Sequence, residues 1–572
     1  MVHFFRIKIF TFISLFIVLY TTSSLSRNTE YVFSEKNISN YFSGIISINQ
    51  NNTSQAFDFL KKTQPLQTYH YNYNVQFLRT LVLLKKFDES FDFAKNLDLK
   101  KGDFYESNLL LGINYFINND YLNAEKHFNL LSNGHATDYQ LESYVGDFLS
   151  VMAVASQNNK NESLKRLDSI SDRVINLKKI QEVFLHCYFE SPATISMFKS
   201  LVNDEAETFS RYNFFLVNYL LHKNNISDAK KVIDKSYRDY NQNVLIHQSY
   251  EFIIKQNYTK IKNFFNCKNP KDLLSEFFYI IANFYSNEEN YTLSNFYLNI
   301  SIYLNKNFST NQSLLAENYS NQHKEKSAQK IYNSMKKIGN IYSWYASKRL
   351  AYIIASTGKK QKAIKYLKKE ISKITEPSYY NYLDLANFLN NNKNYKEAIQ
   401  YYSITLKKLE SNHSLIPTIL EKRGTSYERL GIWDKAEKDL KKSLKLSPDQ
   451  PYVLNYLAYS WLEKKKNIAE SLQMLIRADE LKQNDGYITD SLGWGFYLTK
   501  DYLEAEKLLR RAVILMPTDP VIANHYGDIL WKLNKNIQAR YFWKQAQKLE
   551  LEDKEFIENI NEKLIFGLMD KS

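Results

Sequence analysis

The chain has 572 residues, a formal net charge of +14, 44% hydrophobic residues and 15% aromatic residues. Its 14 Gly and 9 Pro are about 2.4% and 1.6% of the chain, where about 7% and 5% are usual. These figures exclude a turn-rich β-sandwich, a collagen-like protein and a disordered chain, and two Cys exclude a disulfide scaffold or a Cys-rich zinc protein. Lys is spread along the chain among acidic residues, so the charge indicates no nucleic-acid partner. Many helices joined by short turns are expected.

The N-terminal residues 1–26 have the pattern of a secretory signal peptide. Arg6 and Lys8 precede an uncharged, mostly apolar run over 9–20, and small polar residues follow up to Ser26, where cleavage is expected. This predicts a periplasmic or otherwise exported protein. The alternative is an uncleaved segment that anchors the chain in the inner membrane, with the rest peripheral to it.

An N-terminal array of helical hairpins is predicted over 27–274. Gly44 and Ala56 mark one copy, and the run Leu111–Phe128 marks a clearer one. From 139 to 274 the pattern is helical but degenerate. A different helical domain over 139–274, between two shorter arrays, is the alternative.

The two cysteines fall in this weaker region. Cys187 and Cys267 lie in different predicted copies with at least one hairpin between them. Packed helices are about 8–10 Å apart, whereas a disulfide needs Cα atoms within about 7 Å. Two free, buried thiols are therefore expected.

A C-terminal array is predicted over 275–553, because small residues recur there every 34 or 35 positions. Each copy has a small residue on its first helix and two on its second, which lets the two helices approach closely. The recurring positions are Gly424, Ala458, Gly493 and Gly527, then Ala436, Ser471, Ala505 and Ala539, then Ser443, Ala478, Ala512 and Ala546.

This stretch resembles the tetratricopeptide repeat. The family pattern of Leu-Gly, Tyr, Ala, a large residue, Ala and Pro at fixed offsets is matched closely by Arg423–Pro448 and Leu492–Pro517. The resemblance implies an all-α fold, a right-handed α-solenoid of stacked helix-turn-helix hairpins. The phase predicts one elongated array of roughly fifteen hairpins, in which each copy contacts only its neighbours.

The C-terminal residues 554–572 are predicted to form a capping helix and tail. The run Glu555–Leu568 places apolar residues among charges, as expected of a helix that covers the open end of the array. The C-terminal part also resembles exported tetratricopeptide-repeat proteins of alphaproteobacteria, which implies a role on the envelope side of a Gram-negative bacterium.

Motifs for chemistry are missing from the sequence. It contains no His-x-x-x-His pair, Gly-x-Gly-x-x-Gly run, Walker loop or Gly-x-Ser-x-Gly elbow, and repeats fill nearly all of the chain. We therefore predict no catalytic residues, no metal, no cofactor and no enzymatic activity.

The concave face lined by the first helices is the predicted binding site. Such repeats bind extended peptides or partner helices there, with Asn and Asp holding backbone and aromatics as anchors. The predicted partners are envelope or secreted proteins. The sequence does not predict the oligomeric state of the scaffold. Alternatives are recognition of polysaccharide or peptidoglycan during envelope assembly, and an accessory role in pilus or secretion machinery. The predicted partner-binding residues are Asn455, Tyr459, Asp490, Trp494, Tyr497, Asn524, Asp528 and Trp531.

Overall fold

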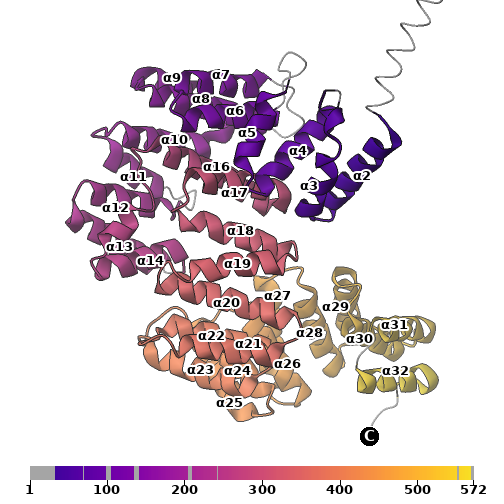
Figure 1. Cartoon of the computed structure of the whole chain (residues 1–572). Coiled ribbons are helices and arrows are strands. Elements are labelled where there is room, and N and C mark those ends of the chain that lie inside the picture. Colours follow the sequence, from indigo (N-terminus) through magenta and orange to yellow (C-terminus); the bar gives the residue numbers. More distant parts are fainter. Residues whose placement is uncertain are drawn as a thin grey trace, which may run out of the picture. The chain divides into compact units, whose positions relative to one another are not determined.

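The computed structural model describes residues 33–68, 70–97, 105–133, 141–203, 209–240, 242–550 and 553–568. The predicted signal peptide lies outside these ranges. Throughout the described ranges the regular structure is helical, without strands, and consecutive helices pack as antiparallel hairpins, so the fold is an all-α solenoid of helical hairpins (Figure 1). The chain divides into two compact units, one ending at Ile354 and the other beginning at Ala355.

In the described residues, unit 1 contains nine hairpins, from α2/α3 to α18/α19, followed by α20, whose last two residues fall in unit 2. Its helices are α2 (Glu35–Asn49), α3 (Thr53–Lys61), α4 (Tyr71–Leu83), α5 (Phe87–Lys95), α6 (Tyr105–Ile117), α7 (Tyr121–Asn133), α8 (Glu142–Ser156), α9 (Lys160–Ser169), α10 (Ile175–Tyr188), α11 (Thr194–Val202), α12 (Tyr212–His222), α13 (Ile226–Tyr240), α14 (Val244–Ile254), α15 (Tyr258–Lys262), α16 (Pro270–Asn287), α17 (Tyr291–Leu304), α18 (Ser309–Asn321), α19 (Glu325–Met335) and α20 (Asn340–Ser356), with short 3-10 turns at Gln64–Thr68 and Asp172–Val174.

Unit 2 contains α21, then five hairpins from α22/α23 to α30/α31, then α32. Its helices are α21 (Lys360–Ile371), α22 (Tyr379–Asn391), α23 (Tyr395–Lys408), α24 (Ile416–Glu428), α25 (Trp433–Leu446), α26 (Pro451–Glu463), α27 (Ile468–Leu481), α28 (Gly486–Leu498), α29 (Tyr502–Leu515), α30 (Pro520–Lys532), α31 (Asn536–Leu549) and α32 (Lys554–Phe566).

The turn inside each hairpin carries a residue in the left-handed backbone region. In unit 1 these include Asn51, Lys85 and Asn119, each 34 positions after the last, and in unit 2 Lys500 and Asn534 continue the same spacing. The helix before such a turn ends in hydrogen bonds that this conformation permits, for example from the Asn52 N–H to the Ser47 carbonyl at 2.7 Å. The chain is poor in Gly because Asn and Lys take this position in most turns.

Small residues on the first helix receive large residues from the second helix. A Cβ added to Gly527 would lie 2.4 Å from the Trp543 ring, and one added to Gly112 would lie 2.4 Å from the Phe128 ring. In both cases the large residue follows the glycine by 16 positions. This close approach is the physical basis of the small-residue spacing in the sequence.

Hairpins also continue through the degenerate region. The helices from α8 to α15 alternate as they do elsewhere, and left-handed residues at Asn158, Glu190, Asn224 and Gln256 mark their turns. The contacts place this region inside unit 1. The boundary that the repeat pattern predicts at 274/275 falls within α16.

Unit 1 folds back on itself, so the expectation of one elongated array with neighbour-only contacts is wrong there. The α16/α17 hairpin packs against α4, α8 and α10, which come three to six hairpins earlier (Figure 1). The Phe87 ring stacks on Tyr303 at 4.0 Å, and the Tyr105 and Tyr297 hydroxyls are 3.0 Å apart. The physical reason is that apolar side chains of α17, such as Phe296, Leu298 and Ile300, point to different sides of the helix, so burying them requires cover from more than the neighbouring hairpin.

The fold-back also brings the cysteines together, so the prediction of two free thiols is wrong. Cys187, on α10, and Cys267, just before α16, form a disulfide with Cα atoms 5.9 Å apart. The spacing argument assumed that the intervening copies separate them. Instead α14 and α15 are short, and the segment after them returns to α10, where Phe265 contacts Phe184.

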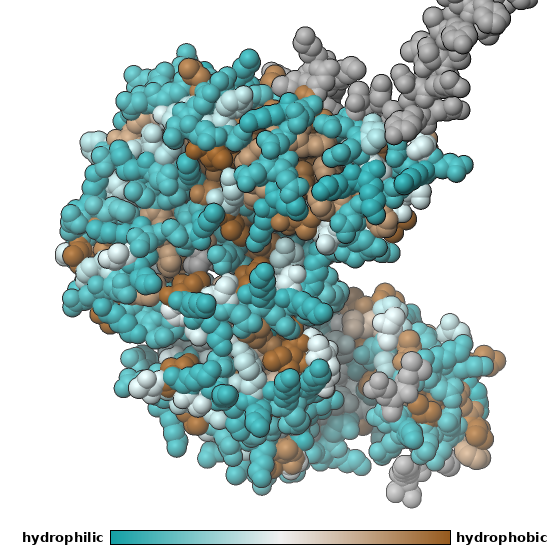
Figure 2. Space-filling view, viewed as in Figure 1, coloured by the Kyte–Doolittle hydropathy of each residue, from teal (hydrophilic) through white to brown (hydrophobic). Residues whose placement is uncertain are grey.

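The surface is mostly polar, with apolar side chains in separate patches. Figure 2 shows teal side chains over most of the visible face and brown ones gathered between helices. None of the helices in the described ranges combines the length and apolar character that a bilayer crossing requires.

Candidate functional site

The predicted site residues lie on three neighbouring helices of unit 2, α26, α28 and α30. These are the first helices of successive hairpins, and each packs on the next. Local sequence sets where they begin. Asp485 and Asp519 accept hydrogen bonds from the first N–H groups of α28 and α30, and Pro520 occupies the first turn of α30. We call the surface formed by the eight predicted residues on these helices the first-helix face.

A buried ion pair lies at the centre of the first-helix face. The Asp490 carboxylate on α28 is 3.0 Å from Nδ1 of His525 on α30, and both side chains are buried. Burial acts to lower the pKa of His525, but the charge and hydrogen bond of Asp490, together with the Asp528 charge, outweigh it, and the pKa is raised above its ordinary value. Asp528 also favours the imidazolium. The pair is held at the junction of two repeats.

A stack of aromatic rings covers this pair. The Trp494 ring lies 4.1 Å from the His525 ring and 4.5 Å from the Tyr497 ring, nearly parallel to both. The Trp494 indole N–H donates to Glu463 at 2.9 Å. Trp494 and Tyr497 are half-buried, so the stack is rigid and presents part of its surface to solvent.

Two predicted residues on α26 extend the face. Tyr459 is half-buried, and burial raises the pKa of its hydroxyl, followed by the nearby charges of Glu463 and Asp490. The Oδ1 atom of Asn455 is buried without a hydrogen-bond partner among the described residues. The residue as a whole is half-exposed, so this oxygen can accept a hydrogen bond from a ligand only after the side chain turns outward.

Helix α32 takes the place that a ligand was predicted to occupy at the other end of the face. Lys563 donates to Asn524 Oδ1 at 2.9 Å and to both oxygens of Asp528 at 2.8 and 2.9 Å. Asp528 also accepts the Trp543 indole N–H at 2.8 Å. Asn524 and Asp528 are therefore engaged by the chain itself.

Trp531 is likewise directed into the molecule. It packs 5.4 Å from Trp543, lies under the Arg540 guanidinium at 4.7 Å, and contacts Gly567 beyond α32. The structure thus brings Tyr459, Asp490, Trp494 and Tyr497 together around His525. It places Asn524, Asp528 and Trp531 in a separate cluster under α32.

Sequence reasoning missed four residues of these clusters, namely Glu463, His525, Trp543 and Lys563. A signal existed for His525, because it follows Asp490 by 35 positions, which is one repeat, and side chains at that spacing meet on neighbouring first helices. No comparable signal marked Lys563, because α32 begins outside the repeat pattern.

The chemistry of the face is that of recognition. Its carboxylates are paired with His525 and Lys563, and no group of three or more His, Cys, Asp or Glu side chains in the described ranges is arranged to hold a metal ion. Aromatic surface beside hydrogen-bonding groups suits the binding of another molecule.

The comparisons with known proteins agree with repeats of this kind. No protein-family model matches the chain. A TPR repeat-containing protein of Pseudomonas aeruginosa is 28% identical over 183 residues, which cover 32% of this chain and 30% of that protein. The match thus spans less than a third of the relative's length.

Solved structures of similar proteins include the pilF protein of Pseudomonas aeruginosa, 15% identical, with a TM-score of 0.28, over 33% of this chain and 91% of that one. Another is the C-terminal part of a TPR repeat-containing protein from Cytophaga hutchinsonii, 15% identical, with a TM-score of 0.30, over 38% and 87%. The chain is built from hairpins similar to those of tetratricopeptide-repeat proteins.

Proposed function

We propose that the chain is a non-enzymatic protein-interaction scaffold that binds a segment of a partner protein on the first-helix face. The observation that carries this proposal is the half-exposed stack of Trp494 and Tyr497 over the buried Asp490–His525 pair. Tryptophan and tyrosine are the residues most enriched at the energetic centres of interfaces. The stack is held in place before binding, so little conformational entropy is lost on association.

Asn455 supplies the polar part of the proposed site. Its unpartnered Oδ1 lies on α26, next to the helix that carries the stack. An extended segment lying across α26 and α28 would place a side chain on the rings, and the Asn455 side chain would turn outward to accept a backbone N–H from it.

We further propose that the protein works in the cell envelope, as the exported alphaproteobacterial type would. Two features support this. The N-terminal sequence has the pattern of a signal peptide, and the Cys187–Cys267 disulfide is of a kind that persists in oxidising compartments and is rare in the cytosol. Fractionation with thiol labelling tests it: the protein should lie in the envelope fraction with both cysteines unreactive until reduction. Reactive thiols in a cytosolic protein would contradict the export proposal.

Photo-crosslinking of the full chain in cells tests the scaffold proposal. A photoreactive residue replaces Tyr497, and the matched control replaces Tyr541, which is 67% exposed on the second helix α31. A protein crosslinked at 497 but not at 541 is expected, and Trp494→Ala should weaken its binding about thirtyfold. Asp528→Ala is a poor test variant because it leaves Lys563 without its carboxylate.

The outcomes separate the competing functions. Crosslinking of glycan at 497, with retention on peptidoglycan, would replace the protein-scaffold proposal by polysaccharide recognition. Crosslinking to a pilus or secretion component would specify the partner as accessory machinery. If cells that contain the exported protein give no crosslink at 497, the first-helix face is not the partner-binding site.

A further inference from the structure

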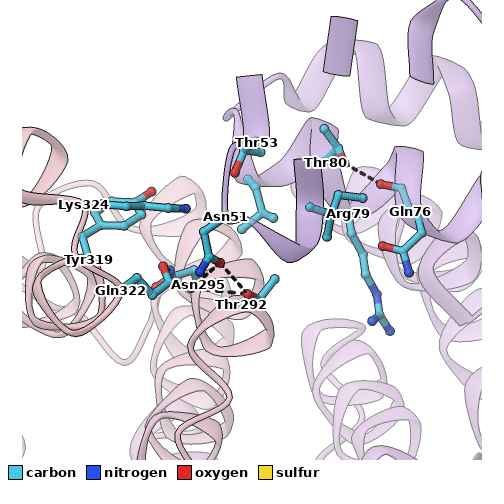
Figure 3. A pocket seen from close by; sticks show the side chains of 12 residues that line it. Asn51, Thr53, Gln76, Arg79, Thr80, Thr292, Asn295, Tyr319, Gln322 and Lys324 are labelled. Atoms are coloured by element: carbon cyan, nitrogen blue, oxygen red, sulfur yellow. Dashed lines mark hydrogen bonds between the residues drawn. The ribbon is translucent and has the colours of Figure 1, made fainter. Parts of the chain in front are cut away.

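A small polar pocket lies within unit 1, far in sequence from the first-helix face. Its walls come from the α2–α3 turn, α4, α17 and the α18–α19 turn, which the fold-back brings together (Figure 3). Its volume of about 60 Å³ is several times the 10–15 Å³ that one water needs, and far below that of a drug-sized site. The pocket suits a single small group. It is lined by Ile48, Asn51, Thr53, Gln76, Arg79, Thr80, Leu83, Thr292, Asn295, Tyr319, Gln322 and Lys324.

The lining has two cations and no acidic side chain. Arg79 is neutralised, because its guanidinium donates to the buried Glu106 at 2.8 Å and turns away from Lys324 (Figure 3). Lys324 is different. Its ammonium lies 5.6 Å from the centre of the Tyr319 ring and has no hydrogen-bond or carboxylate partner in the part of the chain that the structure describes.

The surroundings of Lys324 leave its charge uncompensated. Burial lowers the pKa of Lys324. A half-buried ammonium without an acidic partner is costly, and an anion beside it would offset that cost.

Hydrogen bonds fix the side chains that lie beside Lys324. Asn51 Oδ1 accepts from the Gln322 side chain at 3.1 Å and from the Thr292 hydroxyl at 3.5 Å, and Gln322 in turn accepts from Asn295 at 3.1 Å. Because the Asn51 oxygen is turned toward this network, its amide nitrogen remains a donor for a ligand. These side chains are therefore fixed before any ligand binds.

We propose that this pocket binds a small oxyanion, a carboxylate or a phosphate group, with the Lys324 ammonium as its charged contact and the Asn51 amide as a hydrogen-bond donor. A compact ammonium on a flexible stem is a common ligand for phosphate and carboxylate oxygens. The site is independent of the first-helix face and of the scaffold proposal.

Titration calorimetry on the full chain tests the proposal, with inorganic phosphate and acetate as separate probes and chloride at matched ionic strength. At millimolar concentrations one of the two probes should bind. Lys324→Gln should weaken that binding about tenfold or more, while Lys324→Arg should retain most of it.

The matched control is Lys326→Gln, an exposed lysine on α19 that does not line the pocket. It should change binding by no more than about twofold. Binding of phosphate alone would identify a phosphate site, and binding of acetate alone a carboxylate site. Failure of the wild type to bind either probe would overturn the proposal, and so would equal weakening by Lys324→Gln and Lys326→Gln, which would show that only general surface charge is involved.

Discussion

The two units are built from the same hairpins but connect them differently. In unit 1, hydrogen bonds reach across much of the sequence, as from Gln322 to Asn51, 271 positions apart. In unit 2, the main helix contacts run between helices one or two apart, and even the bond from Lys563 to Asn524 spans only 39 positions. Arrays whose repeats contact only their neighbours can unfold one repeat at a time. A core joined by contacts between distant repeats unfolds cooperatively, as one unit. The number of distant contacts, rather than the repeat itself, should decide how each unit unfolds.

The Arg211–Glu276 pair gives the most severe test of this difference. Glu276 is fully buried, and Arg211 donates to both of its oxygens at 2.7 and 2.8 Å, joining α16 to the start of α12. Burial raises the pKa of Glu276 even with Arg211 beside it. Arg211→Met should destabilise unit 1 by about 3–5 kcal/mol, because it leaves a buried carboxyl unpaired.

Amide hydrogen exchange would measure this effect helix by helix. Protection should fall throughout unit 1, including α4 and α17, and remain in unit 2. The double variant Arg211→Met/Glu276→Leu should recover most of the loss, because no unpaired charge remains. Loss of protection confined to α12 and α16 would show that unit 1 does not unfold as one.

The disulfide gives the next largest expected effect. Replacing both Cys187 and Cys267 by Ser opens a loop of 80 residues and should cost about 2–4 kcal/mol. Urea unfolding followed by hydrogen exchange should show this loss in unit 1 alone. Reduction of the wild type should reproduce it and leave the double variant unchanged. Equal destabilisation of unit 2 would contradict the independence of the units.

A substitution that disturbs the packing inside one hairpin of unit 2 should cost less stability and affect fewer helices. Gly527→Ala places a methyl group 2.4 Å from the Trp543 ring and should cost about 1–3 kcal/mol through overpacking. Exchange should increase in α30, α31 and α32 while α22 to α25 keep their protection. Gly424→Ala is the matched control, since its nearest contact is 3.1 Å, to Leu440, and it should cost less. Loss of protection throughout unit 2 would show that it too is cooperative.

The hairpins were predictable because the contacts that define them are local. A glycine and the large residue 16 positions later meet within one hairpin, as Gly527 and Trp543 do. The 34-residue spacing of small residues follows directly from this contact, because each hairpin needs a small residue at the same position. In the degenerate region Asn158 and Asn224 keep the left-handed turn, and Ser163 and Ala229 keep a buried small residue five positions after it.

The fold-back and the disulfide depend on distant contacts, which spacing does not encode. The sequence carried one physical sign of them in Leu293–Leu304, where apolar side chains point to several sides of the helix, between polar ones, instead of forming one stripe. A helix of that kind needs cover from more than its neighbours. The repeat spacing alone does not identify the residues that cover this helix, such as Phe87, which stacks on Tyr303.

The location of the candidate site was predictable from the sequence. Which of its polar side chains are already bound by other parts of the chain was less predictable. Position counting placed Asp490 and Trp494 on the same first helix, α28, and in the structure both side chains contact His525 on the next first helix, α30. Counting does not reveal whether a polar residue is already engaged. Asp528 is engaged by Lys563 because α32 continues the row of first helices.

The Asp490–His525 pair should make unit 2 sensitive to pH, with the smallest effect of the four. Burial and the Lys563 charge act to lower the pKa of His525, but the charge and hydrogen bond of Asp490 and the Asp528 charge together outweigh them and raise it above its ordinary value of 6.5. The folded state therefore holds this proton to a higher pH than the unfolded state does. The stability from the pair is fully present below about pH 6.5 and is lost as the pH rises through the raised pKa.

Exchange from α28 and α30, compared between about pH 6 and pH 9 after correction for intrinsic rates, should reveal this loss. Asp490→Asn should lower stability at pH 6 and flatten the pH dependence, because the imidazolium then has no carboxylate beside it. The Trp494 stack rests on the same ring, so binding to the first-helix face should weaken over the same pH range. If the pH dependence persists in Asp490→Asn, another titrating group causes it. The aromatic stack then does not depend on the charge of the Asp490–His525 pair.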